Sequence, residues 1–551
     1  MLGRMMFQPL LISNLIDHAE RYHADTAIIS KNTDGSITET NWAKVAANSK
    51  RFANVLKDLG LSQSDRVATI AWNNHRHLES WYAISGSGYI CHTINPRLFP
   101  EQLIFIINDA QDRVVLFDKT FAPLIAAVKA HLAHVEHFIC LDAADDAITE
   151  KIADVKFYDD LVSKESEQFT WPSFDEQTAS SLCYTSGTTG NPKGVLYSHR
   201  STILHSFAIS LPDSLNLSAN DIMLPVVPMF HVNAWGTPYA AAMVGCTVVL
   251  PGPGLDGPSL VNMIDTYKVT VALGVPTIWQ GLLLAAKQLG SQLTSMNRNV
   301  VGGSACPPSM LAAFKNDYNC DTIHAWGMTE TSPLGSANQL KAKHQQLSEQ
   351  ERFKLRLSQG RPPFGVDLRL TDEEKGNHEI ARDGEQIGNL QIKGHWIIDS
   401  YFGKDESALT TDGWFDTGDI ATLDEDGFLY ISDRSKDLIK SGGEWISSVE
   451  LENLAMGHSD ILMAAVIAAE HPKWDERPIV IAVKKPDSTV TEQGVLDYYT
   501  DKIAKWQIPD RVIFVDSIPL SGTGKMLKRE LRTQYGQVLL EQNPVSVSYT
   551  H

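Results

Sequence analysis

Apolar residues near the beginning of the chain follow two spacings, one typical of strands and one typical of helices. Residues 66–74 (RVATIAWNN) and 112–118 (DRVVLFD) are short runs that contain several apolar residues, which predict buried strands. Residues 41–60 repeat apolar side chains at helical spacing and end at Gly60, which predicts an amphipathic helix closed by glycine. Strands and helices are therefore expected to alternate.

From about residue 180 onward, apolar runs end in loops that contain glycine, proline or hydroxyl side chains. These runs are residues 179–184, 221–230, 269–275, 297–303 and 321–326. In α/β folds, the loops that follow the strands carry the functional side chains. The pattern predicts an α/β protein with its functional site at strand ends.

The composition changes after residues 413–448 (GWFDTGDIATLDEDGFLYISDRSKDLIKSGGEWISS). Within this stretch, residues 424–427 (DEDG) predict a hairpin turn. At its end, residues 447–450 (SSVE) form a capping box, which predicts the start of a helix that ends near Gly457. Residues 1–435 are therefore expected to form a large α/β domain, and residues 436–551 a small α+β domain.

Charge and cysteine usage narrow the class of protein. The 551 residues include 47 Lys and Arg against 66 Asp and Glu, a net charge of −19, so general attraction to nucleic acid or to an anionic membrane is not expected. The six cysteines have neither paired nor zinc-type spacing, which favours free thiols in a reducing cytoplasm. No signal-peptide pattern is expected at the N-terminus, and the apolar stretch from Ala240 is too short and broken to span a bilayer.

Residues 184–201 (YTSGTTGNPKGVLYSHRS) combine glycines and hydroxyl side chains with Lys193. Backbone N–H groups, hydroxyls and a lysine can together cradle phosphate oxygens, although a surface linker can have the same composition. The loop is not a Walker A motif, because Lys193 lies between Pro192 and Gly194, and residues 522–525 (GTGK) fail the same motif.

Five motifs together carry a family resemblance. They are YTSGTTGNPKGV (184–195), WGMTE (326–330), GWFDTGD (413–419), DRSKDLIKSGGEWI (433–446) and SGTGK (521–525). In order and spacing they resemble the adenylate-forming superfamily, which contains acyl-CoA synthetases, luciferases and adenylation domains of peptide synthetases. The resemblance covers nearly the whole chain, and it implies a multi-lobed N-terminal domain with a small mobile C-terminal domain.

Further segments are similar to the fatty-acyl-CoA ligase branch of this superfamily. They are HTINPRLFPEQL (92–103), MFHVNAWG (229–236), VGGSA (301–305) and IKSGGEWISSVELEN (439–453). The resemblance implies an AMP-forming ligase that joins a carboxylate to the α-phosphate of ATP, releases pyrophosphate and then transfers the acyl group to coenzyme A. The combination of His231, Trp235, Trp326 and Pro333 is similar to ligases for short and medium acids, including 3-methylthiopropanoate.

The resemblance also implies a nucleotide site. Its residues would be Thr185, Ser186, Gly187, Thr188, Thr189, Gly190, Lys193, Gly302, Gly303, Ser304, Ala305, Trp326, Gly327, Met328, Asp419 and Arg434. Residues 185–190 would hold the β- and γ-phosphates, and residues 302–305 would lie against adenine, where small side chains permit close approach. Asp419 would accept hydrogen bonds from the ribose with help from Arg434, although a turn aspartate and a surface arginine are the ordinary alternatives.

Four residues are implied to act on the reacting groups: Lys525, His231, Thr329 and Glu330. Lys525 would contact the carboxylate and the α-phosphate, Thr329 would contact the α-phosphate, and Glu330 with Thr188 would bind Mg²⁺. The alternatives are a solvated lysine, a structural histidine and a carboxylate that only stabilises a helix N-terminus.

The implied acyl site consists of His231, Trp235, Gly302, Trp326 and Pro333. Trp235 lies four residues after His231, so on a helix the two would face the same way. Trp235 would then wall the acyl pocket, unless it is a core residue. Trp326 replaces the tyrosine usual in the family, and it could stack on adenine while crowding the acyl group.

Coenzyme A would be bound by Lys440, Gly442, Gly443, Glu444 and Trp445, unless the two glycines only form a turn. The family's C-terminal domain rotates about a hinge that matches Lys436, which would withdraw Lys525 between the two half-reactions. The family often has Pro-Arg-Thr where residues 519–521 are Pro-Leu-Ser, which puts the contacts of the missing arginine in doubt.

Other functions stay open at this stage. Within the enzyme class they are a long-chain or aryl-CoA ligase and an enzyme that loads a carrier protein, although no carrier-like domain is expected. A regulator that has lost catalysis is a third alternative, against which Lys525, Glu330 and Asp419 are all present. We expect a cytoplasmic enzyme that acts on small molecules with ATP, Mg²⁺ and coenzyme A, and a homodimer with the N-terminal segment as a candidate contact.

Overall fold

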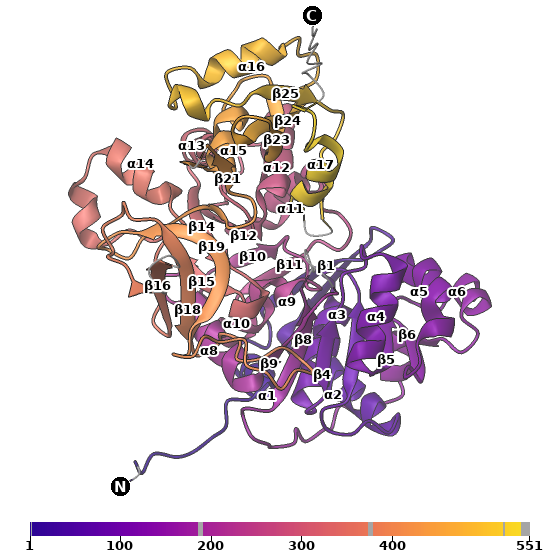
Figure 1. Cartoon of the computed structure of the whole chain (residues 1–551). Coiled ribbons are helices and arrows are strands. Elements are labelled where there is room, and N and C mark those ends of the chain that lie inside the picture. The colour runs from indigo at the N-terminus through magenta and orange to yellow at the C-terminus, as the bar shows by residue number, and fades with distance from the viewer. Residues whose placement is uncertain (2, 186–190, 373–377, 443, 522–523, 541–551) are drawn as a thin grey trace, which may run out of the picture.

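The computed structural model describes residues 1, 3–185, 191–372, 378–442, 444–521 and 524–540 (Figure 1). Two large sheets dominate the N-terminal domain. The first has the order β7-β6-β5-β3-β4-β8-β9 and the second the order β15-β14-β13-β12-β10-β11-β1-β2. The strands of the first are β3 (Arg66–Ile70), β4 (Ile90–Thr93), β5 (Asp112–Phe117), β6 (His137–Cys140), β7 (Lys156–Phe157), β8 (Ala179–Tyr184) and β9 (Gly194–Ser198). Those of the second are β1 (Ala27–Lys31), β2 (Ile37–Asn41), β10 (Ile222–Pro225), β11 (Thr247–Leu250), β12 (Val271–Gly274), β13 (Arg298–Val301), β14 (Asp321–Gly327) and β15 (Leu334–Ala337).

Both faces of each sheet are buried, because helices cover them on two sides. In β3, Val67 belongs to the core between the sheets, whereas Ala68 and Ile70 belong to the core on the outer face; successive strand residues point to opposite faces. The helices between the sheets are α1 (Ile12–Tyr22), α2 (Trp42–Asp58), α3 (His75–Gly86), α8 (His199–Ser210) and α10 (Thr237–Val244). The outer helices are α4 (Pro100–Ala110), α5 (Ala122–Val128) and α6 (Asp146–Lys151) on the first sheet, and α11 (Gly257–Tyr267), α12 (Pro276–Leu289) and α13 (Pro308–Tyr318) on the second.

The local predictions for strands and helices are borne out with small shifts at their ends. The helix expected over residues 41–60 is α2, which begins after Asn41, whose side chain accepts a hydrogen bond from the Lys44 backbone N–H. Gly60 follows with φ +77°. Three further helices of the N-terminal domain are short: α7 (Tyr158–Val162) and α9 (Val232–Trp235), whose buried apolar residues join the core between the sheets, and α14 (Glu349–Leu357).

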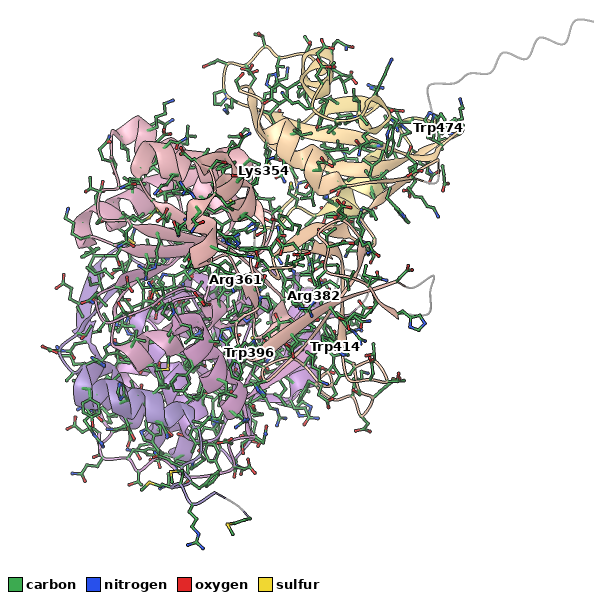
Figure 2. All side chains as sticks on the ribbon, turned by 90° about the vertical axis from the view of Figure 1, so that its left-hand side faces the viewer. Lys354, Arg361, Arg382, Trp396, Trp414 and Trp474 are labelled. Carbon is green, nitrogen blue, oxygen red and sulfur yellow. The ribbon has the colours of Figure 1, made fainter. Side chains whose placement is uncertain are left out.

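A third, antiparallel sheet completes the N-terminal domain, with the order β17-β16-β18-β19-β20. Its strands are β16 (Val366–Asp372), β17 (His378–Glu379), β18 (Gly388–Gly394), β19 (Phe415–Leu423) and β20 (Leu429–Arg434). The hairpin turn predicted at residues 424–427 joins β19 to β20, and the Gly427 N–H donates to the Asp424 carbonyl at 2.9 Å. Trp396, labelled in Figure 2, connects this lobe to β15 because its Nε1–H donates to the Leu334 carbonyl at 2.8 Å.

The C-terminal domain has its own mixed sheet and its own cores. Its elements are β21 (Ile439–Ser441), β22 (Glu444–Ile446), α15 (Ser448–Met456), β23 (Ile461–His471), β24 (Asp475–Lys484), α16 (Glu492–Tyr499), β25 (Arg511–Phe514) and α17 (Lys528–Tyr535). The Ser447 side chain caps α15 by accepting from the Glu450 N–H, which is one half of the predicted capping box, and Gly457 follows the helix. The predicted fold class, a large α/β part with a small α+β domain, is confirmed. Among the described residues, no helix has both the length and the apolar character needed to cross a membrane.

Asp433, at the end of β20, joins the two domains. Its Oδ2 accepts hydrogen bonds from the backbone N–H (2.6 Å) and the Oγ (2.5 Å) of Ser448, the first residue of α15. The Lys528 Nζ donates to the same Oγ at 2.6 Å and forms an ion pair with Glu452 at 2.7 Å. Because Asp433, Ser448 and Glu452 are all buried, these charge-assisted bonds are shielded from water.

Replacing Asp433 with Ala should loosen the docking of α15. The Ser448 N–H would lose its buried acceptor, a change that typically costs about 1–3 kcal/mol. We expect amide exchange in residues 448–456 to accelerate by about 10- to 100-fold, measured by hydrogen–deuterium exchange of the full chain. Asp412→Ala is the matched control, because Asp412 forms an exposed ion pair with Arg369. Equal acceleration in both variants would contradict a special role of Asp433.

Candidate active site

A cavity of about 390 Å³ lies where strands of both large sheets end. Thr185 follows β8, Gly302 follows β13, and Trp326 and Gly327 end β14. Functional sites of α/β folds form at the carboxyl ends of strands, where loops can diverge around a ligand. The cavity is therefore at the position that the sequence pattern predicts.

Most of the predicted site residues that the structure describes meet at this cavity. Its lining includes Thr185, Lys193, His231, Trp235, Gly302, Gly303, Trp326, Gly327, Met328, Thr329, Glu330, Pro333, Arg434 and Lys525. A second cavity, of about 910 Å³, shares several of these residues and extends between the two domains. Its lining adds Ser304, Ala305, Asp419 and Lys436.

The structure does not bring the predicted coenzyme A residues to either cavity. The exposed hairpin of β21 and β22 carries Lys440, Gly442, Glu444 and Trp445. None of these four is among the described residues that line the two cavities. The Gly442 N–H donates to the carbonyl of Trp474, which Figure 2 labels, at 2.8 Å. The remaining predicted positions, Ser186, Gly187, Thr188, Thr189, Gly190 and Gly443, lie outside the described residues.

Lys525 brings a positive charge from the C-terminal domain into the cavity. Its loop is closed by hydrogen bonds from the Ser521 N–H to the Lys525 carbonyl (2.7 Å) and from the Lys525 N–H to the Ser521 Oγ (3.0 Å). Burial and the neighbouring Arg434 lower the pKa of Lys525 to about 8, against the attraction of Asp419 and Glu330. Lys525 is therefore mostly protonated at neutral pH.

Asp419 is held between an indole and a guanidinium. The Trp326 Nε1–H donates to Asp419 Oδ2 at 2.9 Å, and the Arg434 Nε lies 3.5 Å from Oδ1. Asp419 and Arg434 are directly opposite each other on β19 and β20. Burial raises the pKa of Asp419, although Arg434 and Trp326 oppose this shift. A carboxylate has about four lone-pair positions, so Asp419 retains acceptor capacity for a ligand.

Glu330 is a buried carboxylate with a partner that the sequence analysis missed. Tyr401 O–H donates to Glu330 Oε1 at 2.9 Å, and the Lys193 Nζ lies 4.8 Å from the centroid of the Tyr401 ring, a cation–π distance. Within the described part of the chain, no group of three or more His, Cys, Asp or Glu residues could enclose a metal ion. A single carboxylate suits Mg²⁺, which commonly retains waters and binds substrate phosphates.

The turn that carries Trp235 is left-handed, so the prediction that Trp235 lies on an ordinary helical turn after His231 is wrong. Residues 232–235 all have φ between 45° and 58°. Asn233 stabilises the turn, because its side chain donates to Ser181 Oγ at 3.0 Å and accepts from Thr93 Oγ1 at 3.2 Å. His231 and Trp235 nevertheless line the same cavity, as expected.

Two features of this wall bear on its chemistry. Burial and the nearby Lys525 lower the pKa of His231 to about 3, so His231 is neutral and can exchange hydrogen bonds but adds no charge. A Cβ at Gly302 would come within 2.9 Å of Trp235 Cη2, so the absence of a side chain at Gly302 makes room for the indole.

The apolar end of the cavity contains residues that the sequence analysis missed. They are His205, Ile209, Leu215, Val300 and Leu334. His205 Nε2 accepts a hydrogen bond from the Leu334 N–H at 3.3 Å, so in its neutral form His205 carries its proton on Nδ1. The spacing of His205 and Ile209, four residues apart on α8, is the one local signal that could have placed them on a common face.

Comparisons with known proteins agree with this geometry. The AMP-binding enzyme family matches residues 15–402, and the C-terminal domain of AMP-binding enzymes matches residues 450–525. A 3-methylmercaptopropionyl-CoA ligase of Ruegeria lacuscaerulensis is 58% identical over 539 residues, which cover 98% of this chain and 100% of the relative. A medium-chain-fatty-acid–CoA ligase of Ectopseudomonas oleovorans is 54% identical over 98% of this chain and 99% of the relative.

Solved structures give the same result for the fold. An anthranilate CoA ligase in complex with anthranoyl-AMP superposes with a TM-score of 0.85 at 24% identity, over 96% of this chain and 98% of the other. The family matches span both domains, and the named relatives cover almost the whole chain. The chain therefore belongs to the AMP-binding enzyme family, as one of its adenylate-forming acyl-CoA ligases.

Proposed function

We propose that this chain converts a short- or medium-chain carboxylic acid, 3-methylthiopropanoate in particular, to its coenzyme A thioester through an acyl-adenylate. The observation that carries the proposal is the cavity of about 390 Å³, in which the polar groups of Lys525 and Glu330 face an apolar end walled by Trp235. The 58% identity to a 3-methylmercaptopropionyl-CoA ligase supports this choice of acid. Two indoles in the wall leave less room for a long alkyl or aryl group.

In the first half-reaction, a carboxylate oxygen attacks the α-phosphorus of ATP and pyrophosphate leaves. The Lys525 ammonium would neutralise the two approaching anions, and the Thr329 hydroxyl would donate to an α-phosphate oxygen. Neutral His231 would orient the carboxylate by a hydrogen bond. Mg²⁺ would be held by Glu330, with Thr188 as a further candidate ligand, and the bound ion would offset phosphate charge.

The nucleotide would lie across the two joined cavities. Adenine would contact residues 302–305 and the Trp326 ring, and the ribose hydroxyls would donate to Asp419 on the side that Trp326 leaves open. The phosphates would reach Lys193 and the loop 185–190. The geometry of Asp419, Trp326 and Arg434 supports this arrangement, because all three groups converge on one edge of the cavity.

The second half-reaction requires another arrangement of the domains. With Lys525 in the cavity, the hairpin that carries Lys440, Gly442, Glu444 and Trp445 is exposed. We propose that residues 436–551 rotate about Lys436 after the adenylate forms. Lys525 would then withdraw, and this hairpin, with Gly443, would approach the path by which the thiol of coenzyme A reaches the adenylate. The contact of Asp433 with Ser448 spans the hinge, so it would break in this rotation.

We further propose a cytoplasmic homodimer. All six cysteines are free and buried, which suits a reducing compartment. Met5, Met6 and Phe7 are 87%, 91% and 82% exposed in the N-terminal segment, which projects from the body in Figure 1. Such an arm could pack against a second copy, and sedimentation velocity with and without residues 1–8 tests this contact.

The proposed substrate is tested with a matched pair of acids. 3-Methylthiopropanoate and pentanoate have the same chain length and differ by sulfur in place of a methylene. We expect both to support release of pyrophosphate and AMP, with 3-methylthiopropanoate at least as good by kcat/KM, and dodecanoate and cinnamate to be poorer by about tenfold or more. A preference for dodecanoate or cinnamate would overturn the proposed acid but not the ligase class.

Lys525→Ala should separate the two half-reactions. Because Lys525 acts on charge that develops during adenylation, the rate of pyrophosphate release should fall by about 10²-fold or more. Thioester formation from supplied acyl-adenylate should change far less. Lys315→Ala is the control, because Lys315 lies outside both cavities and forms an exposed ion pair with Asp321. Equal losses in both half-reactions of Lys525→Ala would remove Lys525 from this role.

The pH dependence of the first half-reaction should report Lys525. Its pKa, lowered to about 8, means that the ammonium is present below pH 8 and is lost as the pH rises above it. We expect the rate of pyrophosphate release to fall above about pH 8. Lys525→Arg should be slower but should not show this fall, because arginine stays protonated. An unchanged alkaline limb in Lys525→Arg would assign the titration to another group.

A further inference from the structure

The apolar end of the acyl cavity is closed by elements of unequal rigidity. Ile209 belongs to α8 and Val300 to β13, so regular hydrogen bonding holds their backbones. Leu215 lies in the connection between α8 and β10, outside any helix or strand, and its side chain is 3% exposed. The place of Leu215 therefore depends on the contacts of that loop.

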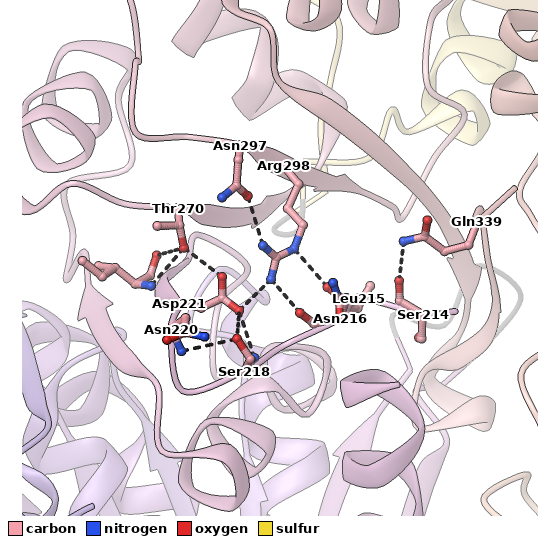
Figure 3. Close-up of polar contacts among 11 residues, drawn as sticks. Ser214, Leu215, Asn216, Ser218, Asn220, Asp221, Thr270, Asn297, Arg298 and Gln339 are labelled. Atoms are coloured by element: carbon pink, nitrogen blue, oxygen red, sulfur yellow. Dashed lines mark hydrogen bonds and ion pairs between the residues drawn. The ribbon is translucent and has the colours of Figure 1, made fainter. Parts of the chain in front are cut away.

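The side chain of Arg298, the first residue of β13, donates hydrogen bonds to backbone carbonyls of this loop (Figure 3). Its Nε donates to the Leu215 carbonyl at 3.1 Å, and its Nη2 donates to the Asn216 carbonyl at 2.8 Å. Asn216 has φ +55°, in the left-handed region, which asparagine adopts more readily than most residues other than glycine. The guanidinium thus holds both the residue at the cavity and the left-handed residue that follows it.

An ion pair fixes the guanidinium in turn. The Arg298 Nη2 lies 2.7 Å from Asp221 Oδ2, with the two side chains 14% and 6% exposed. Asp221 also accepts hydrogen bonds from the Ser218 N–H (2.9 Å) and from Thr270 Oγ1 (2.9 Å). Burial opposes the charge of Asp221, but Arg298 and these bonds outweigh it and lower the pKa of Asp221. The pair is therefore ionised at neutral pH.

A second side chain holds the same loop from the other side. The Gln339 Nε2 donates to the Ser214 carbonyl at 2.9 Å (Figure 3). Three consecutive loop carbonyls, those of Ser214, Leu215 and Asn216, are thus bound by side chains from distant parts of the chain. This arrangement leaves the Leu215 side chain facing the cavity.

We infer that Arg298 is a positioning residue for acyl-chain length, which acts by holding Leu215 as the end wall of the acyl cavity. The inference rests on the proposed function, because it assigns the apolar end of this cavity to the acyl chain. When the guanidinium is absent, the loop can shift and Leu215 can move away. The cavity then lengthens at its apolar end, while Lys525, Glu330 and Asp419 stay where they are.

The test is a chain-length profile of Arg298→Gln. The ratio of kcat/KM for decanoate over pentanoate should rise by about tenfold, the scale of pocket discrimination between hydrocarbon chains. Leu215→Ala should raise the same ratio. In the double variant the rise in this ratio should be much smaller than the product of the two single rises, because Arg298 acts through Leu215. If Arg298→Gln does not fold, Gln339→Leu takes its place in the test. It is a milder change and should shift the ratio in the same direction.

Arg113→Gln is the matched control. The Arg113 Nη1 also binds a backbone carbonyl, that of Gly60 at 3.1 Å, and an aspartate, Asp65 at 2.7 Å, away from both cavities. We expect a similar loss of thermal stability without a change in the length ratio. The inference would be overturned if the length ratio of Arg298→Gln were unchanged from the wild type. It would also be overturned if the ratio rose as much in Arg113→Gln as in Arg298→Gln.

Binding measurements keep this test separate from the proposed function. Calorimetric titration of pentanoate and decanoate into the same variants reports length discrimination without turnover. A wild-type chain that forms no adenylate from any acid would refute the proposed function. A ratio of dissociation constants that shifts in Arg298→Gln, but not in Arg113→Gln, would still support the positioning role of Arg298.

Discussion

The amine of Lys525 has to reach, as a cation, into a cavity built by the other domain. Burial disfavours the charged form of Lys525, whereas the nearby carboxylates of Asp419 and Glu330 favour it. The pKa of Lys525 is therefore lowered only to about 8. The approach of Lys525 depends on the docking of α15 and α17, which the buried contacts of Asp433, Ser448 and Lys528 hold. The complete polar site therefore exists in one arrangement of the two domains, and a rotation that separates Asp433 from Ser448 would dismantle it.

The wall that carries Trp235 depends on strained backbone. A left-handed conformation costs about 1–2 kcal/mol per residue for ordinary amino acids, and residues 232–235 adopt it four times in succession. Buried packing and the two hydrogen bonds of Asn233 offset this cost. The result is that Trp235 lies against Gly302, so an indole and a missing side chain together set the width of the cavity.

The two ends of the cavity are stabilised in different ways. At the polar end, Glu330 has a direct partner in Tyr401, and in the adjoining larger cavity Asp419 has one in Trp326. At the apolar end, Leu215 is held by its backbone through Arg298 and Gln339. Changes at the polar end are thus expected to alter the chemistry, whereas changes at the apolar end are expected to alter which acid fits.

Much of the fold and part of the site could be predicted from short windows of sequence. The period of apolar residues predicts strands such as β3 and helix α2, and the motifs that contain Lys193, Glu330, Asp419 and Lys525 predict that these residues meet, as they do. The resemblance also indicated Trp235, but its left-handed turn could not be inferred, because ordinary spacing rules assume right-handed helices. Local pattern carries such information because hydrogen bonding and side-chain direction repeat within a few residues.

The tertiary structure alone decided the partners. Tyr401 is 71 residues from Glu330, Arg298 is 83 from Leu215, and Lys528 is 80 from Ser448. No local periodicity joins such pairs, and each of their polar groups could equally have been solvated. They meet because packing of the sheets, lobes and domains removes water around them, and a buried donor or acceptor then requires a protein partner.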